Sequence, residues 1–196
     1  TTGQVTKATN TYRLAAIALG GNVTSSLGDP RETLIHALSR LRSSDVRIVA
    51  MSRFFRTPAF PAGSGPDYVN AAALLETVLD PEALLAYLHG IEADLGRTRR
   101  VRWAERTIDL DIVFHGDSLL PDAATVQTWI DLPADRQRAE APPGLILPHP
   151  RLQDRPFVLI PLADIAPGWR HPLTGTTVAG MVGALSAASK AEIRPV

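Results

Sequence analysis

The chain has 196 residues, enough for one compact domain with extensions and too few for a large multidomain assembly. Its 45% apolar and 20% charged residues are typical of a globular protein, and no stretch reaches the roughly eighteen uncharged apolar residues of a membrane-spanning helix. Twenty basic and twenty acidic residues give zero net charge, which argues against a partner held by a global field, such as nucleic acid or a membrane surface.

The N-terminal part predicts a leader, a strand and a helix. Residues 1–12 are polar and aperiodic, which is typical of a flexible leader, and residues 13–19 form a short apolar run typical of a buried strand. Asp29, Pro30 and Glu32 have the spacing of a capping box with a proline in the first helical turn. Order is therefore expected from about residue 13 onward.

Two more strands and a second helix are expected in the middle of the chain. Residues 46–55 and 68–76 are rich in strand-forming side chains and are separated by a loop with several prolines and glycines, so we expect them to pair. Asp80 then precedes a proline, and leucines and isoleucines follow at helical spacing as far as Gly96. This helix is expected to pack on the sheet.

The clearest strand signal lies at residues 108–114. Apolar and polar residues alternate strictly there, so we expect one face to carry the apolar side chains and the other to carry two carboxylates. The apolar set is Ile108, Leu110, Ile112 and Phe114, and the acidic set is Asp109 and Asp111.

The C-terminal part is harder to assign. Residues 116–147 carry several prolines and no clear period, which favours a long surface insertion. Residues 156–165 are apolar enough for a buried helix despite an internal proline, and residues 178–188 suit a small helix or a weakly held tail. We expect one domain over residues 13–176, followed by a helix or tail over residues 177–196.

The order of these elements is strand, helix, strand, strand, helix, strand. This βαββαβ order predicts an α+β, ferredoxin-like sandwich, in which helices pack on one face of an antiparallel sheet. The other face is expected to be free for a ligand.

Asp109 and Asp111 are the first candidates for chemistry. At a rise of about 3.3 Å per residue their Cα atoms lie 6–7 Å apart on one strand face, so the carboxylates can converge. Two ionised carboxylates repel by roughly 3 kcal/mol at about 6 Å and an effective dielectric near 20, which calls for a cation, a proton or full solvation. Hard oxygen ligands favour magnesium or manganese, whereas the alternative is a merely solvated polar face.

Five arginines lie just before this pair, at positions 97, 99, 100, 102 and 106. Guanidinium groups bind phosphate, and magnesium bridges phosphate oxygens to carboxylates, so a metal-nucleotide complex would use both clusters. A solvated basic loop or an RNA-binding stripe is the alternative. Lysine occurs only at positions 7 and 190, and the P-loop motif is absent, so arginine must supply any phosphate contacts.

Several other side chains are candidates for binding. Trp103 lies in the arginine-rich segment without an apolar pattern that would bury it, and His149 is held between two prolines at a fixed angle. Aromatic and amide side chains that would suit a flat heterocycle occur at Tyr68, Asn70, Phe60 and Phe157, although aromatic residues more often belong to the core. The absence of cysteine is compatible with a reducing cytosol, and no signal-peptide pattern opens the sequence, so we expect a cytoplasmic protein.

Six stretches of the chain resemble 6-hydroxymethyl-7,8-dihydropterin pyrophosphokinases of the folate pathway. The resemblance runs from about residue 13 to residue 169. It is carried by LGGN at 19–22, SRFFRTP at 52–58, PDYVNA at 66–71, GR at 96–97, RTIDLDI at 106–112 and residues 148–162.

The resemblance implies a ferredoxin-like fold and a reaction. Members of the family transfer the β,γ-pyrophosphate of ATP to the hydroxymethyl group of the dihydropterin, with two magnesium ions, and release AMP. The implied catalytic residues are Asp109, Asp111, Arg97, Arg106, Arg99 and Arg102, with Asp109 and Asp111 as the magnesium ligands. ATP is expected to contact Glu92, Arg97, Arg106, Ile112, His149 and Arg155. The pterin is expected to contact Gly20, Thr57, Pro58, Phe60, Tyr68, Asn70, Trp103 and Phe157.

Other readings of the sequence stay open beside this one. The insertion at 116–147 is longer than the family resemblance leads us to expect and would touch either the nucleotide or a partner protein. An RNA-binding module shares the strand order, but Asp109 and Asp111 would repel RNA. A family member without activity, docked on dihydropteroate synthase, is a third reading. The resemblance also implies a monomer or weak dimer and an association with that synthase.

Overall fold

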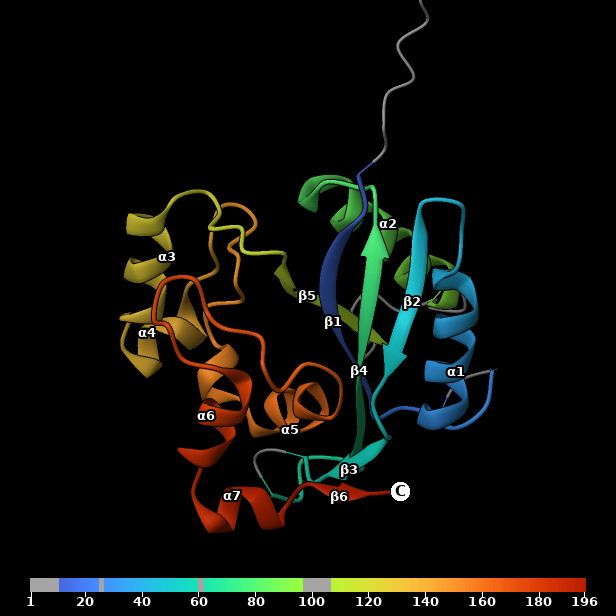
Figure 1. Cartoon of the computed structure of the whole chain (residues 1–196). Coiled ribbons are helices and arrows are strands. Elements are labelled where there is room, and N and C mark those ends of the chain that lie inside the picture. Colours follow the sequence, from blue (N-terminus) through green and yellow to red (C-terminus); the bar gives the residue numbers. More distant parts are fainter. Residues whose placement is uncertain (1–10, 25–26, 60–61, 97–106) are drawn as a thin grey trace, which may run out of the picture.

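The computed structural model describes residues 11–24, 27–59, 62–96 and 107–196. Its centre is an antiparallel sheet, in which β1 (Arg13–Gly21) lies between β4 (Tyr68–Thr77) and β5 (Asp109–His115). The far side of β4 pairs with β2 (Val46–Met51) and with β3 (Phe55–Thr57). Figure 1 shows this twisted sheet with helices around it. The predicted α+β sandwich is confirmed, with β1 and β4 as its central strands.

Two helices cover one face of the sheet. They are α1 (Pro30–Leu41) and α2 (Pro81–Leu95), and both begin where the capping residues predicted. The side chain of Asp29 accepts a hydrogen bond from the Glu32 backbone N–H at the start of α1, and Asp80 caps α2 in the same way through Ala83. These caps satisfy N–H groups that a helix start would otherwise leave unbonded.

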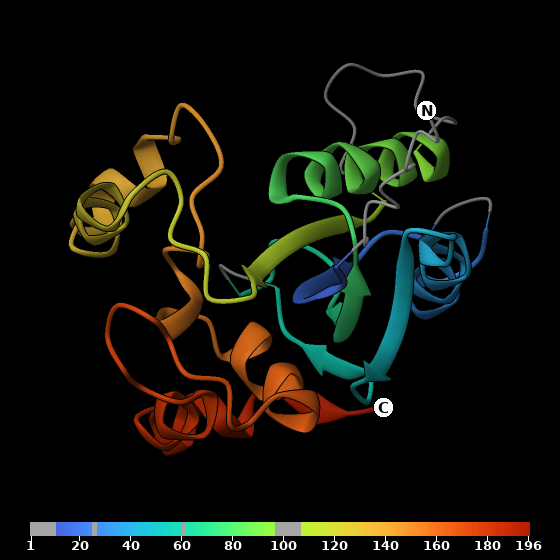
Figure 2. The ribbon, with the colours of Figure 1, turned by 45° about the horizontal axis from the view of Figure 1, so that its top comes forward.

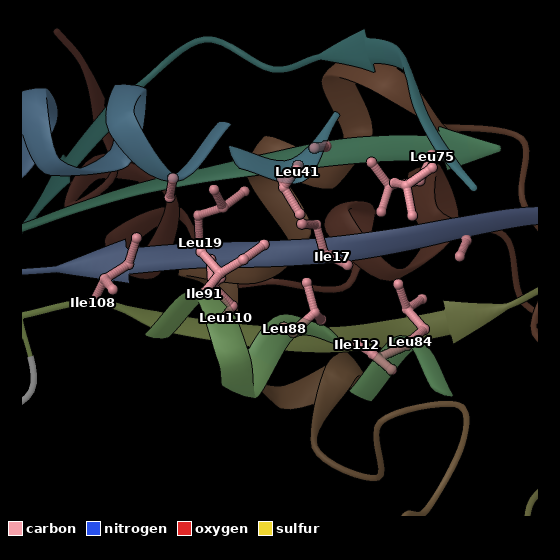
Figure 3. Packing of buried hydrophobic residues seen from close by; sticks show 14 of the residues in the cluster. Ile17, Leu19, Leu41, Leu75, Leu84, Leu88, Ile91, Ile108, Leu110 and Ile112 are labelled. Atoms are coloured by element: carbon pink, nitrogen blue, oxygen red, sulfur yellow. The ribbon is translucent and has the colours of Figure 1, made fainter. Parts of the chain in front are cut away.

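The main hydrophobic core lies between these helices and the sheet. Figure 3 shows leucines and isoleucines from β1, β4, β5 and both helices interdigitating there. The labelled side chains are Ile17, Leu19, Leu41, Leu75, Leu84, Leu88, Ile91, Ile108, Leu110 and Ile112, and all are at most 5% exposed. Burial of this kind is the main source of stability, and it leaves the opposite face of the sheet to carry the ligand site.

The second face of the sheet is only partly free, in contrast to the expectation. Helix α5 (Pro156–Ile165) packs against β4 and β1, and α6 (Val178–Gly183) packs against α5. Figure 2 shows these helices on the side of the sheet opposite to α1 and α2. A second buried cluster fills the space beneath them, because α5 is apolar on nearly every side and must be covered. A cavity therefore forms beside α5 rather than over an open sheet.

A bulge in β5 changes the predicted faces. Ile17 of β1 lies opposite Ile112, but Ala16 lies opposite Phe114, so Val113 is an extra residue. An extra residue reverses the alternation of side chains beyond it. The expectation that Phe114 shares a face with Ile108, Leu110 and Ile112 is wrong: its ring lies in the second cluster and stacks on Trp169 at 4.2 Å.

The strand expected over residues 46–55 is interrupted. Its first part ends at Met51, and β3 starts at Phe55, because Ser52 bonds to β4 in a different way. The Ser52 hydroxyl accepts a hydrogen bond from the Ala72 backbone N–H at 2.8 Å, while the Ser52 N–H donates to the Ala72 carbonyl. A side chain thus takes the place of a strand carbonyl, and the chain changes direction.

The remaining segments lie at the periphery. Residues 116–147 contain α3 (Ala123–Ile130) and α4 (Ala134–Ala139), and a bridge between Leu120 and Leu147 joins the two ends of the segment. Figure 1 shows both helices standing to one side of the sheet. A single 3-10 turn (Leu152–Asp154) precedes α5. Among the residues described, no helix combines the length and the apolar character needed to cross a membrane.

Two adjacent residues of α1 test where the stability lies. Leu34 is fully buried in the main core, whereas the side chain of Ile35 is 45% exposed. We expect Leu34→Ala to lower the free energy of unfolding by about 2–5 kcal/mol, because it leaves a cavity in a packed core. Ile35→Ala is the control and should change it by less than about 0.5 kcal/mol. Urea unfolding of both variants measures the difference, and equal losses would contradict this account of the core.

Candidate functional site

Small residues of β1 form the floor of the site. Gly20 lies opposite Asn70 of β4 on one side and opposite Asp109 of β5 on the other. Two residues earlier, Ala18 lies between Ala72 and Asp111 in the same manner. The polar side chains of the two neighbouring strands therefore flank a floor that is almost without side chains, which leaves room for a ligand.

A cavity of about 430 Å³ opens above this floor; we call it the sheet cavity. It is bounded by β1, β3, β4, β5, the start of α5 and a segment near the C-terminus. All of the described residues that the sequence predicted for the pterin and the metal line it. They are Gly20, Thr57, Pro58, Tyr68, Asn70, Asp109, Asp111 and Phe157, joined by Arg155 from the predicted ATP set.

One end of the sheet cavity is polar and buried. Asn70 is 7% exposed and Thr57 is 5% exposed, and the Asn70 side-chain amide donates to the Thr57 hydroxyl at 2.8 Å. This bond fixes the amide, so that its carbonyl oxygen is directed toward Gly20. A Cβ atom on Gly20 would lie 2.7 Å from that oxygen, closer than real contacts allow. Glycine is thus required where the amide and a ligand meet the backbone.

The two carboxylates line the opposite end of the sheet cavity. Asp109 is half-buried and Asp111 is exposed, and both belong to the same face of β5 ahead of the bulge. Their donor atoms are hard oxygens, which suit magnesium. No group of three or more His, Cys, Asp or Glu side chains able to hold a metal occurs within the described ranges. Magnesium commonly takes one or two carboxylates and completes its shell with phosphate and water, so this pair fits the ion.

A second cavity, of about 560 Å³, adjoins the first; we call it the histidine cavity. It is lined by part of α2, by the insertion and by the segment around His149. Ile112, His149 and Arg155, all predicted to contact ATP, lie on its wall. Asp111 and Arg155 line both cavities, so the two hollows meet at a carboxylate and a guanidinium group.

His149 is held as a neutral ring. Its backbone N–H donates to Val113 at the bulge, and its Nδ1 accepts the Arg151 backbone N–H at 3.1 Å. Burial and then the nearby charges of Arg155 and Arg151 lower the pKa of His149 to about 3. At neutral pH the ring is therefore uncharged, and because Nδ1 is the acceptor, its proton resides on Nε2. It can donate one hydrogen bond but carries no charge toward a phosphate.

Arginine supplies the positive charge at the junction. Burial lowers the pKa of Arg155, and the carboxylate of Asp111 opposes that shift; the group is charged at every ordinary pH. Its guanidinium carbon lies 5.8 Å from the centre of the Phe157 ring. Arg151 also lines the histidine cavity, and its Nε is buried without a hydrogen-bond partner among the described residues. An anion entering this cavity would meet both side chains.

Of the remaining predicted site residues, the described part of the chain includes Glu92 alone. Arg97, Arg99, Arg102, Trp103, Arg106 and Phe60 lie outside the described residues. Glu92 is half-buried in the last turn of α2, where its backbone carbonyl accepts the Gly96 N–H, and it lines neither cavity. Its contact with ATP stays a prediction.

Some lining residues have no signal in the sequence. Trp129, Gln137 and Glu140 of the insertion line the histidine cavity, and Glu192 and Ile193 line the sheet cavity. No motif marks these positions, and each lies at its cavity because its segment packs against elements that are distant in the sequence. For Trp129, Gln137 and Glu140, the unusual length of the insertion is the one sequence feature that indicated a possible role.

Fold and site together define a small α+β domain with two adjoining cavities that meet at a carboxylate and a guanidinium group. The model of the 7,8-dihydro-6-hydroxymethylpterin-pyrophosphokinase (HPPK) family matches residues 16–167, and the chain belongs to this family. It is 35% identical over 169 residues to the 2-amino-4-hydroxy-6-hydroxymethyldihydropteridine pyrophosphokinase of Synechocystis, covering 86% of this chain and 74% of that protein. For the enzyme of the same name from Pseudomonas aeruginosa the identity is 39%, covering 80% and 82%.

Solved structures agree on the fold. Plasmodium falciparum HPPK-DHPS superposes with a TM-score of 0.61 at 15% identity, over 90% of this chain and 45% of that one. The chain thus spans less than half of that larger protein. The reaction of the HPPK family, pyrophosphate transfer from ATP to hydroxymethyldihydropterin in folate biosynthesis, is the reaction of this chain.

The neutral state of His149 has a consequence for stability. In the unfolded chain this ring takes up a proton near pH 6.5, whereas in the folded chain it does so only near pH 3. The unfolded state therefore binds more protons in this window, and stability is lost as the pH falls, by at most about 1.4 kcal/mol per pH unit. We expect the unfolding free energy of His149→Gln to depend less on pH between 6.5 and 5 than that of the unmutated protein. His36→Gln, at an exposed position of α1, should keep the original slope; identical slopes in all three would contradict the assignment.

Proposed function

We propose that the sheet cavity binds the dihydropterin and the histidine cavity binds ATP. The observation that carries this proposal is that Asp111 and Arg155 line both cavities. A reaction between a pterin hydroxyl and a phosphate requires the two substrates to meet at one point. At the junction of the two cavities, the carboxylate of Asp111 and the guanidinium group of Arg155 would contact both substrates. Proximity of this kind is the main means by which phosphoryl-transfer enzymes accelerate reactions.

The polar end of the sheet cavity suits the pyrimidine edge of a pterin. That edge combines adjacent N–H donors with ring-nitrogen and carbonyl acceptors, and the carbonyl oxygen of Asn70 is held by the bond from its amide to Thr57. Tyr68 and Phe157 supply aromatic surface for the flat ring. With this edge at Asn70, the substituent of the ring points toward Asp109 and Asp111, where the reaction takes place.

The carboxylates of Asp109 and Asp111 would hold two magnesium ions together with the phosphates of ATP. When bound, magnesium neutralises charge on the phosphate oxygens. The pairing of β5 with β1 holds both carboxylates at fixed positions on one strand face, next to the floor at Gly20. In this arrangement the pterin hydroxyl oxygen attacks the β-phosphorus and its proton passes to solvent. The bond between the β-phosphorus and the oxygen that bridges it to the α-phosphorus breaks, and AMP leaves with that oxygen.

The histidine cavity suits the nucleotide for two reasons. Neutral His149 offers an N–H donor, and the positive charges of Arg155 and Arg151 lie next to it. The predicted ATP contacts of Arg97 and Arg106 and the predicted catalytic roles of Arg99 and Arg102 would add positive charge, and Trp103 would add a contact with the pterin. Association with dihydropteroate synthase, a cytoplasmic location and a monomer or weak dimer stay predictions as well.

The identity of the nucleotide product tests the proposal directly. The protein is incubated with ATP, magnesium and 6-hydroxymethyl-7,8-dihydropterin, and nucleotides are separated by chromatography with and without the pterin. We expect AMP to form only when the pterin is present, in equal amount to the pterin diphosphate. Formation of ADP alone would refute pyrophosphate transfer.

The two carboxylates should be essential for turnover. Asp109→Asn and Asp111→Asn keep the size of the side chain but remove the charge, and we expect each to lower kcat/KM by about 10³-fold, or ~4 kcal/mol. Asp117→Asn, at an exposed position just after β5, is the matched control and should retain full activity. Circular dichroism confirms that the variants fold. Unchanged turnover in either cavity variant would disprove the proposed role.

The insertion should contribute to nucleotide affinity. Trp129 of α3 lines the histidine cavity, and stacking of a base on an aromatic ring contributes about 1–3 kcal/mol. We expect Trp129→Ala to raise the KM for ATP about tenfold and to leave the KM for the pterin within a factor of about two. Thr128→Ala, the exposed neighbour on the same helix, should alter neither constant. An unchanged KM for ATP would leave the insertion free for another partner.

A further inference from the structure

The last residues of the chain return to the sheet. After α6, the chain forms α7 (Ala187–Ala191), which packs against α5, and then β6 (Arg194–Pro195), which pairs with β3. Figure 1 shows β6 beside β3 at the lower edge of the sheet. The link between α7 and β6 consists of Glu192 and Ile193, and both residues line the sheet cavity.

Hydrogen bonds hold this link on both sides. Arg56 lies opposite Arg194, and the backbone N–H of Val196 donates to the Phe54 carbonyl at 2.9 Å. On the other side, the N–H of Ile193 donates to Lys190 of α7. Because the two flanking elements are attached to different parts of the domain, the backbone at 192–193 has a defined position at the cavity.

The pairing also sets the neighbours of the link. Continuing the register of β3 and β6 by one residue brings Ile193 beside Thr57, which contacts Asn70 at the polar end of the cavity. Ile193 is half-buried, whereas Glu192 is exposed. An apolar and an acidic side chain are thus added to a cavity whose other acidic groups, Asp109 and Asp111, lie on β5.

We propose that Glu192 is a specificity-determining residue, whose carboxylate accepts hydrogen bonds from the amino group and ring N–H of the bound pterin. The proposal rests on binding of the pterin in the sheet cavity. A carboxylate suits two adjacent N–H donors, because its two oxygens can accept both in parallel. Asn70 and Thr57 form the polar end of the cavity, and Ile193 next to Thr57 shields these contacts from water, which strengthens them.

Direct titration of the pterin tests this role. We measure the dissociation constant of 6-hydroxymethyl-7,8-dihydropterin by its fluorescence, for the unmutated protein, Glu192→Ala and Glu192→Gln, in the presence of a non-hydrolysable ATP analogue. Loss of a charge-assisted hydrogen bond should weaken pterin binding about 10- to 100-fold in Glu192→Ala. The affinity for the ATP analogue and the thermal unfolding temperature should stay unchanged. Arg194→Ala, an exposed residue of β6, is the control and should bind the pterin normally.

A pterin analogue without the 2-amino group separates a hydrogen bond from a general effect on the pocket. We expect the unmutated protein to bind this analogue more weakly than the pterin, and Glu192→Ala to bind the two ligands with nearly equal affinity. Equal weakening of both ligands in Glu192→Ala, or no weakening of either, would overturn the role of Glu192 while leaving the pterin site intact. Absence of pterin binding by the unmutated protein would instead overturn the proposed function and this inference with it.

Discussion

The site depends on the absence of side chains in the middle of the sheet. Gly20 lies between Asn70 and Asp109 on the adjacent strands, and a Cβ at Gly20 would lie only 2.7 Å from the Asn70 amide oxygen. A larger residue there would displace the amide whose position sets the polar end of the cavity. Because β1 is the central strand and its other face packs into the main core, this floor cannot move away, and the flanking side chains have fixed separations.

The bulge at Val113 divides β5 between two tasks. Before it, alternation directs Asp109 and Asp111 into the cavity; after it, Phe114 turns to the same side of the sheet and joins the second core under α5 and α6. The Val113 carbonyl accepts the N–H of His149, so the bulge also ties the histidine segment to the strand. One irregular residue therefore connects the carboxylates, the packing of α5 and the neutral histidine, in line with the tendency of bulges to redirect side chains beside functional sites.

Local patterns were the parts of the fold that the sequence predicted best. The helix starts at Asp29 and Asp80 depend on residues within one turn, and the strand order follows from elements that each have a clear period. The change of face at Phe114 was missed because a bulge depends on pairing with β1 and leaves no mark in the period of β5. For the same reason, Glu192 was invisible: its place at the cavity comes from pairing of β6 with a strand far away in the sequence.

The molecule has no net charge, but charged side chains gather at the two cavities. A chain without net charge cannot attract ATP from a distance through its overall field, so under the proposed binding mode the phosphates are held by local charges at the junction of the two cavities. Arg155 lies there with Asp111, and its positive charge helps to keep His149 neutral. A charged histidine would compete with the arginines for the same anion and would itself be costly to bury. In the proposed binding mode the neutral ring serves as a hydrogen-bond donor at every pH at which the phosphates are fully ionised, so different residues carry out positioning and charge neutralisation.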